Sequence, residues 1–132
     1  MRAAFCIFIV VGSLAAQEHP CVRNFVVPDY PPLARMARLQ GKVVMDIEIL
    51  ANGHIGEIKT SGAHRLLRSE AKRNISRWTF GDFPATSKFP LHHRVVFVYK
   101  LEGGPRSENH PTYVFRLPDF VEIKTNPPIQ NW

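Results

Sequence analysis

The sequence predicts an α+β domain in which two helices pack on one face of a three-stranded antiparallel sheet, and its C-terminal region can add an extra strand or hairpin. Apolar residues alternate with a period of two over 42–50 and 94–101, which is typical of half-buried strands. They recur at helical spacing over 64–78, and Asn52-Gly53 predicts a hairpin turn. With 132 residues, 45% of them hydrophobic, the chain suits one domain with a real core.

The first 16 residues have the pattern of a secretory signal peptide. Arg2 supplies a positive start, an apolar run follows, and small residues lead to Ala16, where we expect cleavage. The apolar run is shorter than the roughly 20 residues of a membrane span, although an uncleaved anchor is the alternative. We therefore expect a secreted chain with no integral membrane span after cleavage. Cys21 would then be its one cysteine, either unpaired or bonded to a second chain.

The residues after the leader predict an extended arm over 17–29 and then two helices. Because proline is tolerated in the first turn of a helix, the first helix is expected over 32–39. Its buried side is expected to hold Leu33, Met36 and Ala37. The second helix, over 64–78, carries one continuous apolar stripe, which predicts its face against the core. This stripe consists of Leu67, Ala71, Ile75 and Trp78.

Three strands follow from the alternating segments, and two more are suggested near the C-terminus. The first strand, over 42–50, returns through the Asn52-Gly53 turn as a second strand over 54–60. The third is expected over 94–101. Two short strand-like runs, within 112–124, flank Pro118-Asp119, and proline limits them to edge or bulge positions.

A set of short motifs, in order and at fixed spacing, spans roughly 27–101. These motifs include Tyr30, Pro31, Gly41, Gly53, Ser61, Gly62, Trp78 and Phe80. Together they resemble the C-terminal domain of TonB, and in that family we expect these residues to have structural roles. The resemblance implies a TonB C-terminal-like domain over 30–102, located in the Gram-negative periplasm, and leaves a C-terminal extension over 103–132 with a proline-containing tail.

The resemblance also implies a protein-binding role, in which the last strand of the domain takes up an extended peptide of an outer-membrane transporter, the TonB box. An exposed edge strand offers unpaired backbone groups for such an addition. We expect the docking edge at 94–100, with four outward side chains, Arg94, Val96, Val98 and Lys100. Ordinary sheet packing explains these side chains equally well. Residues 112–124 could also pair with this strand and close the edge.

Two further departures from the family pattern bear on function. TonB has a membrane anchor and a long proline-rich spacer, whereas this sequence shows a leader and no spacer, so we expect no force transduction by this polypeptide alone. Val27 stands where TonB carries a glutamine that contacts the transporter, which puts recognition of the same transporters in doubt.

The same sequence allows two other functions. A self-capped structural domain that forms a homodimer is one alternative, and a cationic binder of anionic envelope surfaces is another. The second alternative would use Arg65, Arg68, Lys72, Arg73 and Arg77 on the basic side of the 64–78 helix. No aromatic residues interleave with these cations as nucleic-acid binding would require. The sequence has no catalytic motif and no metal-ligand spacing among its six histidines, so we expect neither an enzyme nor a cofactor.

Overall fold

The structure, a computed structural model, describes residues 20–102 and 111–128. The predicted signal peptide lies outside the described residues. In chain order the elements are β1 (Cys21–Asn24), α1 (Pro32–Met36), β2 (Gly41–Ile49), β3 (Ile55–Gly62), α2 (Arg65–Ile75), β4 (Thr79–Gly81), β5 (Leu91–Leu101), β6 (Thr112–Arg116) and β7 (Phe120–Thr125).

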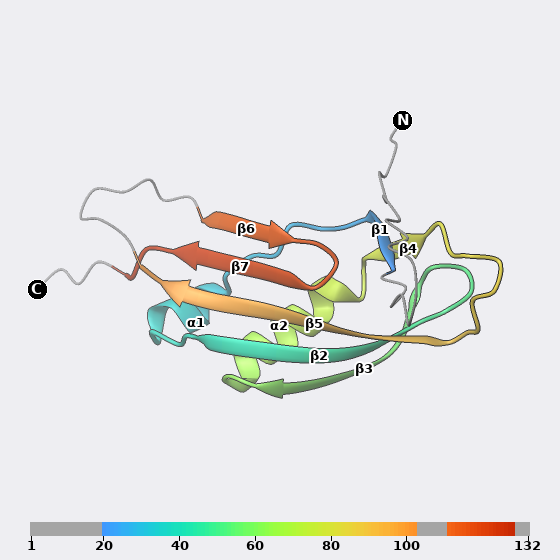
Figure 1. Cartoon of the computed structure of the whole chain (residues 1–132). Helices are drawn as coiled ribbons and strands as arrows, with labels where there is room; N and C mark the ends of the chain where they lie inside the picture. Colours follow the sequence, from blue (N-terminus) through green and yellow to red (C-terminus); the bar gives the residue numbers. More distant parts are fainter. Residues whose placement is uncertain (1–19, 103–110, 129–132) are drawn as a thin grey trace, which may run out of the picture.

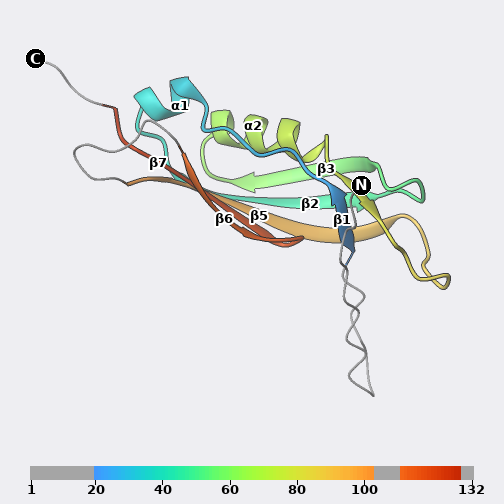
Figure 2. The same cartoon turned by 90° about the horizontal axis from the view of Figure 1, so that it is seen from above.

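Five strands form one mixed sheet in the order β3-β2-β5-β7-β6, and β1 pairs with β4 in a small antiparallel sheet. The three predicted strands make up the β3-β2-β5 part, and they are antiparallel as expected. The prediction of three strands is incomplete because the β6–β7 hairpin extends the sheet, and β7 lies parallel to β5. Both helices lie on one face of this sheet, and in the described part no helix covers the other (Figures 1 and 2).

The core lies between α2 and the sheet. The burial predicted for this stripe is confirmed: Leu67, Ala71 and Ile75 of α2 are fully buried, and so is Trp78, although the helix ends at Ile75 and is shorter than predicted. From the sheet, the core receives alternate residues of β2, β5 and β7, as the period of two requires. These residues are Val43, Met45, Ile47, Ile49, Val95, Phe97, Tyr99, Val121 and Ile123. Trp78 contacts Phe80 and Phe97, with ring centroids 6.5 and 5.8 Å away.

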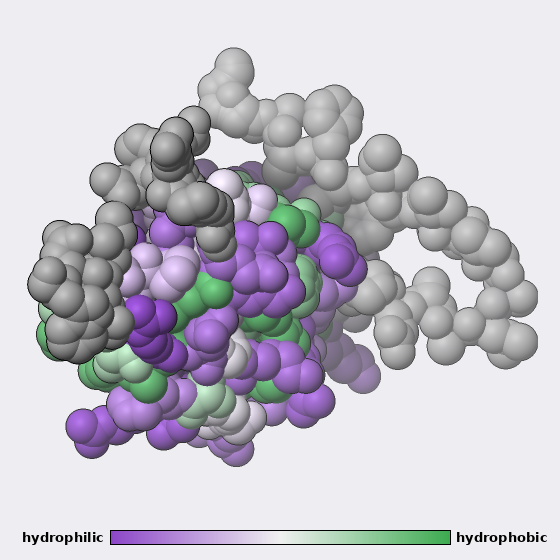
Figure 3. Space-filling model, turned by 90° about the vertical axis from the view of Figure 1, so that its left-hand side faces the viewer, coloured by the Kyte–Doolittle hydropathy of each residue, from purple (hydrophilic) through white to green (hydrophobic). Residues whose placement is uncertain are grey.

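Helix α1 is shorter than predicted and buries a different residue. It buries Ala34, whereas Leu33 and Met36 are 69% and 72% exposed, so the expected apolar side is wrong. Arg38 has a left-handed φ of 57°, which ends the helix after little more than one turn. A single turn is too short to repeat an apolar stripe. Seen from the side of Figure 1 where α1 lies, the surface mixes hydrophobic and hydrophilic residues (Figure 3). Neither α1 nor α2 is long and apolar enough to cross a membrane.

Two motif glycines lie where the backbone leaves no room for a side chain. Gly53 has a φ of 85°, and a Cβ there would lie 2.0 Å from the Phe80 carbonyl oxygen. Gly62 has a φ of 84°, and a Cβ there would lie 2.3 Å from the Lys42 carbonyl oxygen. Only glycine combines this backbone conformation with such a close approach. The motif therefore fixes both ends of the β2–β3 pair.

The order of β7 and β6 in the sheet follows from their side chains. Alternate residues of β7 are buried, and Val121 and Ile123 are completely so. Four of the five residues of β6 are exposed. The strand with the apolar inner side therefore takes the inner position, next to β5, and β6 is left at the edge. Strand β7 is thus part of the core.

The role of β7 in the core can be tested with Ile123→Ala. Because Ile123 is fully buried, we expect a loss of about 2–5 kcal/mol in the free energy of unfolding, measured by urea denaturation. Val114→Ala on β6 is the matched control, and because Val114 is 43% exposed its cost should be much smaller. Equal losses for the two variants would contradict the packing of β7.

Candidate functional site

Strand β5, the expected docking edge, lies inside the sheet. It pairs with β2 on one side and with β7 on the other, from Val96↔Phe120 to Leu101↔Thr125. The Val96 amide donates to the Asp119 carbonyl at 2.8 Å, and the Glu102 amide donates to the Thr125 carbonyl at 2.9 Å. The expectation of an open edge at 94–100 is therefore wrong, and the alternative is confirmed: residues of the 112–124 region close it.

The backbone groups of β5 that a partner strand was expected to bind are therefore hydrogen-bonded to β7 of the same chain. Because backbone N–H groups of a strand alternate in direction, those of Val98 and Lys100 point toward β7 like those of Val96 and Glu102. A second protein could reach them only if β7 were displaced.

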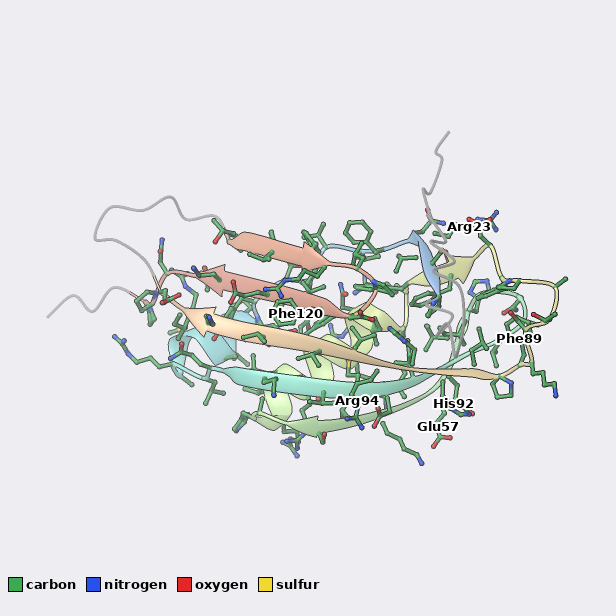
Figure 4. All side chains as sticks on the ribbon, in the orientation of Figure 1. Arg23, Glu57, Phe89, His92, Arg94 and Phe120 are labelled. Atoms are coloured by element: carbon green, nitrogen blue, oxygen red, sulfur yellow. The ribbon has the colours of Figure 1, made fainter. Side chains whose placement is uncertain are left out.

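The four outward side chains of β5 lie on the face of the sheet without helices, where two of them form ion pairs. Arg94 Nε lies 2.8 Å from Asp46 Oδ1, and Lys100 Nζ lies 2.8 Å from Glu122 Oε1. A hydrogen bond from Arg94 lowers the pKa of Asp46, and one from Lys100 lowers the pKa of Glu122. Figure 4 views this face, with Arg94 labelled on it. The two cations of the expected site are therefore engaged by carboxylates of neighbouring strands.

The partly buried Val96 and Val98 lie between these two ion pairs. Val96 is in register with Val44 on β2 and with Phe120 on β7. This cross-strand row is ordinary packing within a sheet. The side chains of β5 thus join β2 to β7 across the sheet.

The sheet has two remaining edges, β3 and β6, and they differ in chemistry. Strand β3 carries the exposed charged residues Glu57 and Lys59, and Figure 4 labels Glu57 there. Charged side chains of this kind protect an edge strand from pairing with another chain. Strand β6 carries Tyr113, Val114 and Phe115 in its centre, and its one charge, Arg116, comes last. It therefore lacks the usual protection.

Exposed apolar side chains gather around β6. Phe115 is 36% exposed and Val114 43%, and Leu117 in the following turn is 38% exposed. Phe25 of the N-terminal arm is 40% exposed and contacts Phe115, with ring centroids 5.3 Å apart. We call these four residues and the backbone of β6 the β6 edge. Large apolar residues exposed together in this way are typical of interaction sites.

The β6 edge is supported by rigid neighbours. The ring of Phe25 lies against Trp78 at 6.0 Å, and Tyr113 stacks on Phe115 at 5.6 Å. Asn74, which is buried, donates to the Val26 carbonyl at 2.9 Å and accepts from Trp78 Nε1 at 2.9 Å. Asn74 thereby ties the arm to α2 and positions Phe25 beside β6.

Residues outside the edge have local structural contacts. Arg68 on α2 donates to the carbonyls of Gly62 and Ala63, at 2.9 and 2.6 Å, and Arg73 lies 3.7 Å from Glu70. Two of the five cations of the proposed basic face thus serve the fold. The remaining three, Arg65, Lys72 and Arg77, are exposed.

Cys21 and His93 also have contacts. Cys21 is buried and disulfide-bonded, so the expectation that it is unpaired is wrong. His93 Nε2 lies 2.8 Å from Asp119 Oδ1 in the β6–β7 turn. Within residues 20–102 and 111–128, no group of three or more His, Cys, Asp or Glu is placed to hold a metal ion.

Sequence reasoning missed the β6 edge. The segment 112–117 is predicted as a strand at an edge or bulge position, but the sequence does not indicate which of the two C-terminal strands is outermost. One signal for an apolar edge is present in the sequence. Tyr113-Val114-Phe115 has apolar side chains on both faces, and proline limits the strand that contains it to an edge or bulge position. The contribution of Phe25 could not be foreseen, because it lies 90 residues from Phe115.

Comparison with known proteins gives one finding. The family model for the C-terminal region of the Gram-negative bacterial TonB protein matches residues 26–101. The search of curated proteins found none that matches the chain. The matched segment contains all eight motif residues and ends with β5, so that the β6–β7 hairpin follows it.

The closed state of β5 predicts slow hydrogen exchange. Because the amides of Val96, Val98 and Lys100 face β7, we expect them to exchange as slowly as the β5 amides that face β2, when measured by NMR. Alternate amides of β6, at the sheet edge, should exchange orders of magnitude faster. Rapid exchange at Val98 and Lys100 would show that β7 leaves the edge readily.

The Lys100–Glu122 pair predicts a dependence on pH. Because the folded state lowers the pKa of Glu122, its stabilising effect is present above the ordinary carboxyl pKa and is lost as the pH falls through the lowered value. Glu122→Gln should therefore lower the urea midpoint near pH 7, and the difference from the wild type should shrink below about pH 4. A difference that stays constant with pH would contradict this role of the pair.

Proposed function

We propose, since the chain belongs to the family of the C-terminal domain of Gram-negative TonB proteins, that it is a periplasmic protein-binding module which takes up an extended segment of a partner protein along the β6 edge. Domains of this family are periplasmic in general, and their role is protein interaction in transport rather than catalysis. The proposal gives this chain the same kind of role with a different docking strand.

The observation that carries the proposal is the chemistry of β6. It is an edge strand with exposed apolar side chains and no charge before Arg116. Alternate N–H and C=O groups of an edge strand point away from the sheet, so that a partner strand can bind them. In strand addition, main-chain hydrogen bonds supply affinity, and the side chains beside the added strand supply selectivity.

Docking at β5 would require the removal of β7, and the cost argues against it. Displacing β7 would expose Val121 and Ile123, each worth about 1.5–3 kcal/mol of burial. It would also break the backbone bonds at Val96 and Glu102 and the Lys100–Glu122 pair. Domains of this size have only about 5–15 kcal/mol of total stability, so the loss would be a large part of it. Binding at β6 requires no such change.

The chemistry of the edge indicates the partner segment. On the helix side, Phe25, Tyr113 and Phe115 form an aromatic surface that suits apolar side chains. On the other face, the Arg116 guanidinium lies over the Phe120 ring, 4.9 Å from its centroid, and can still donate to a carboxylate. We expect an apolar segment with an acidic residue, and the periplasmic segments of TonB-dependent transporters are the partners that the family suggests.

The proposal predicts which strand a partner uses. Val114→Asn removes an apolar contact at the β6 edge and should weaken the binding of a transporter segment roughly fivefold, because cross-strand contacts contribute up to about 1 kcal/mol. Val98→Asn makes the same change on β5 and should leave the affinity nearly unchanged. The measurement is isothermal titration calorimetry against a panel of transporter segments.

Two outcomes would contradict the proposal. One is the absence of binding to any segment of the panel under conditions where circular dichroism shows a folded protein. The other is a loss of affinity in Val98→Asn with none in Val114→Asn, which would place the partner on β5.

A further inference from the structure

We propose that the β6 edge also pairs with β6 of a second copy of this chain, in antiparallel orientation about Val114, so that the two sheets join into one. The inference rests on the proposed function, strand addition at β6, and names an occupant of that same edge. A second copy and a partner segment would then compete for the same backbone groups.

The sequence of β6 is self-complementary in this orientation. The strand has five residues, and Val114 is the central one. A two-fold axis at Val114 pairs Val114 with its copy, Tyr113 with Phe115, and Thr112 with Arg116. Identical surfaces related by a two-fold axis form the commonest type of protein dimer. The odd length of β6 places one residue on the axis and leaves none of the five without a counterpart.

The charges permit this pairing. Arg116 is the one charged residue of β6, and the axis places it opposite the neutral Thr112. The two arginines lie four positions apart along the joined strands, or about 14 Å at the rise of an antiparallel strand. This distance exceeds the screening length of about 8 Å at physiological salt. Like charges therefore do not face each other.

The exposed apolar side chains would be covered by the pairing. Val114 meets its copy on the face without helices, and Tyr113 meets Phe115 of the second copy on the helix side. Phe25 lies beside Phe115 and extends the aromatic contact from the N-terminal arm. Cross-strand pairs of aromatic and β-branched residues are among the favourable ones in sheets.

The other free edge shows why β6 is singled out. Strand β3 carries Glu57 and Lys59 in its centre, both exposed, whereas Tyr113-Val114-Phe115 contains no Lys, Glu or Pro. Among the described residues, β7 is the one strand that pairs with β6. An apolar edge strand of this kind pairs with another chain unless it is covered. A second copy of the chain is a partner that is present wherever the protein is, at the concentration of the protein itself.

Salt separates this occupant from an acidic segment. The chain has a net charge of +6, so two copies repel each other at long range, and screening should strengthen their association. An acidic segment is attracted by the same charge, and screening should weaken its binding. The two modes of occupancy therefore respond to salt in opposite directions.

The pairing about Val114 can be tested by complementary charges on its axis. Val114→Glu and Val114→Lys each place two like charges opposite one another, so each variant should be monomeric. An equimolar mixture should form a heterodimer, because the introduced carboxylate then faces the introduced ammonium. Sedimentation velocity from low to high micromolar concentration measures all three samples beside the wild type, which should dimerise with increasing concentration and more tightly at higher salt.

Lys59→Glu on β3 is the matched control for a change of charge at a sheet edge, and it should dimerise like the wild type. Circular dichroism checks that every variant is folded. The mixture keeps the test decisive even if one variant is less stable, since damage to the fold cannot produce association that appears only on mixing.

Two results would overturn the inference. In the first, the wild type is monomeric at every concentration and the mixture does not associate. In the second, Val114→Glu and Val114→Lys each dimerise alone, which would place the interface elsewhere. Neither result alone removes the proposed function, because binding of a transporter segment that is weakened in Val114→Asn would still support strand addition at β6.

Discussion

The parallel pairing of β7 with β5 is the constraint on which the rest of the structure depends. It makes β5 an inner strand, brings Val121 and Ile123 into the core, and leaves β6 at the edge. The backbone groups of β5 that a partner strand would need are bonded to β7 instead. A single added hairpin thus moves the available edge outward by two strands and changes its side chains.

The new edge combines parts of the chain that are remote in sequence. Phe25 comes from the arm before the first helix, and Phe115 comes from the hairpin after the last motif. Asn74 holds the arm in place through the Val26 carbonyl and the Trp78 indole, so the core itself positions the aromatic surface. The site is therefore preorganised, which reduces the entropy that a partner would lose on binding.

The family relationship and the departure from it concern different segments. Residues 26–101 supply both helices, the four strands from β2 to β5 and all the motif residues, and they explain why the chain folds as it does. The hairpin that follows them determines which strand lies at this edge of the sheet. The strand addition proposed above, by a transporter segment or by a second copy, would therefore use a docking strand that lies outside the family match.

The sequence by itself determined the elements whose signals are local. The period of two in β2 and β5, the stripe from Leu67 to Trp78 and the glycine turn at Gly53 each depend on neighbours within a few residues, and all appear where predicted. The order of the sheet was decided only by the tertiary structure, because both β6 and β7 could pair with β5. The fully buried side of β7 gained more from the inner position. The exposure of Leu33 and the contact between Phe25 and Phe115 likewise depend on packing between distant segments, which no local pattern encodes.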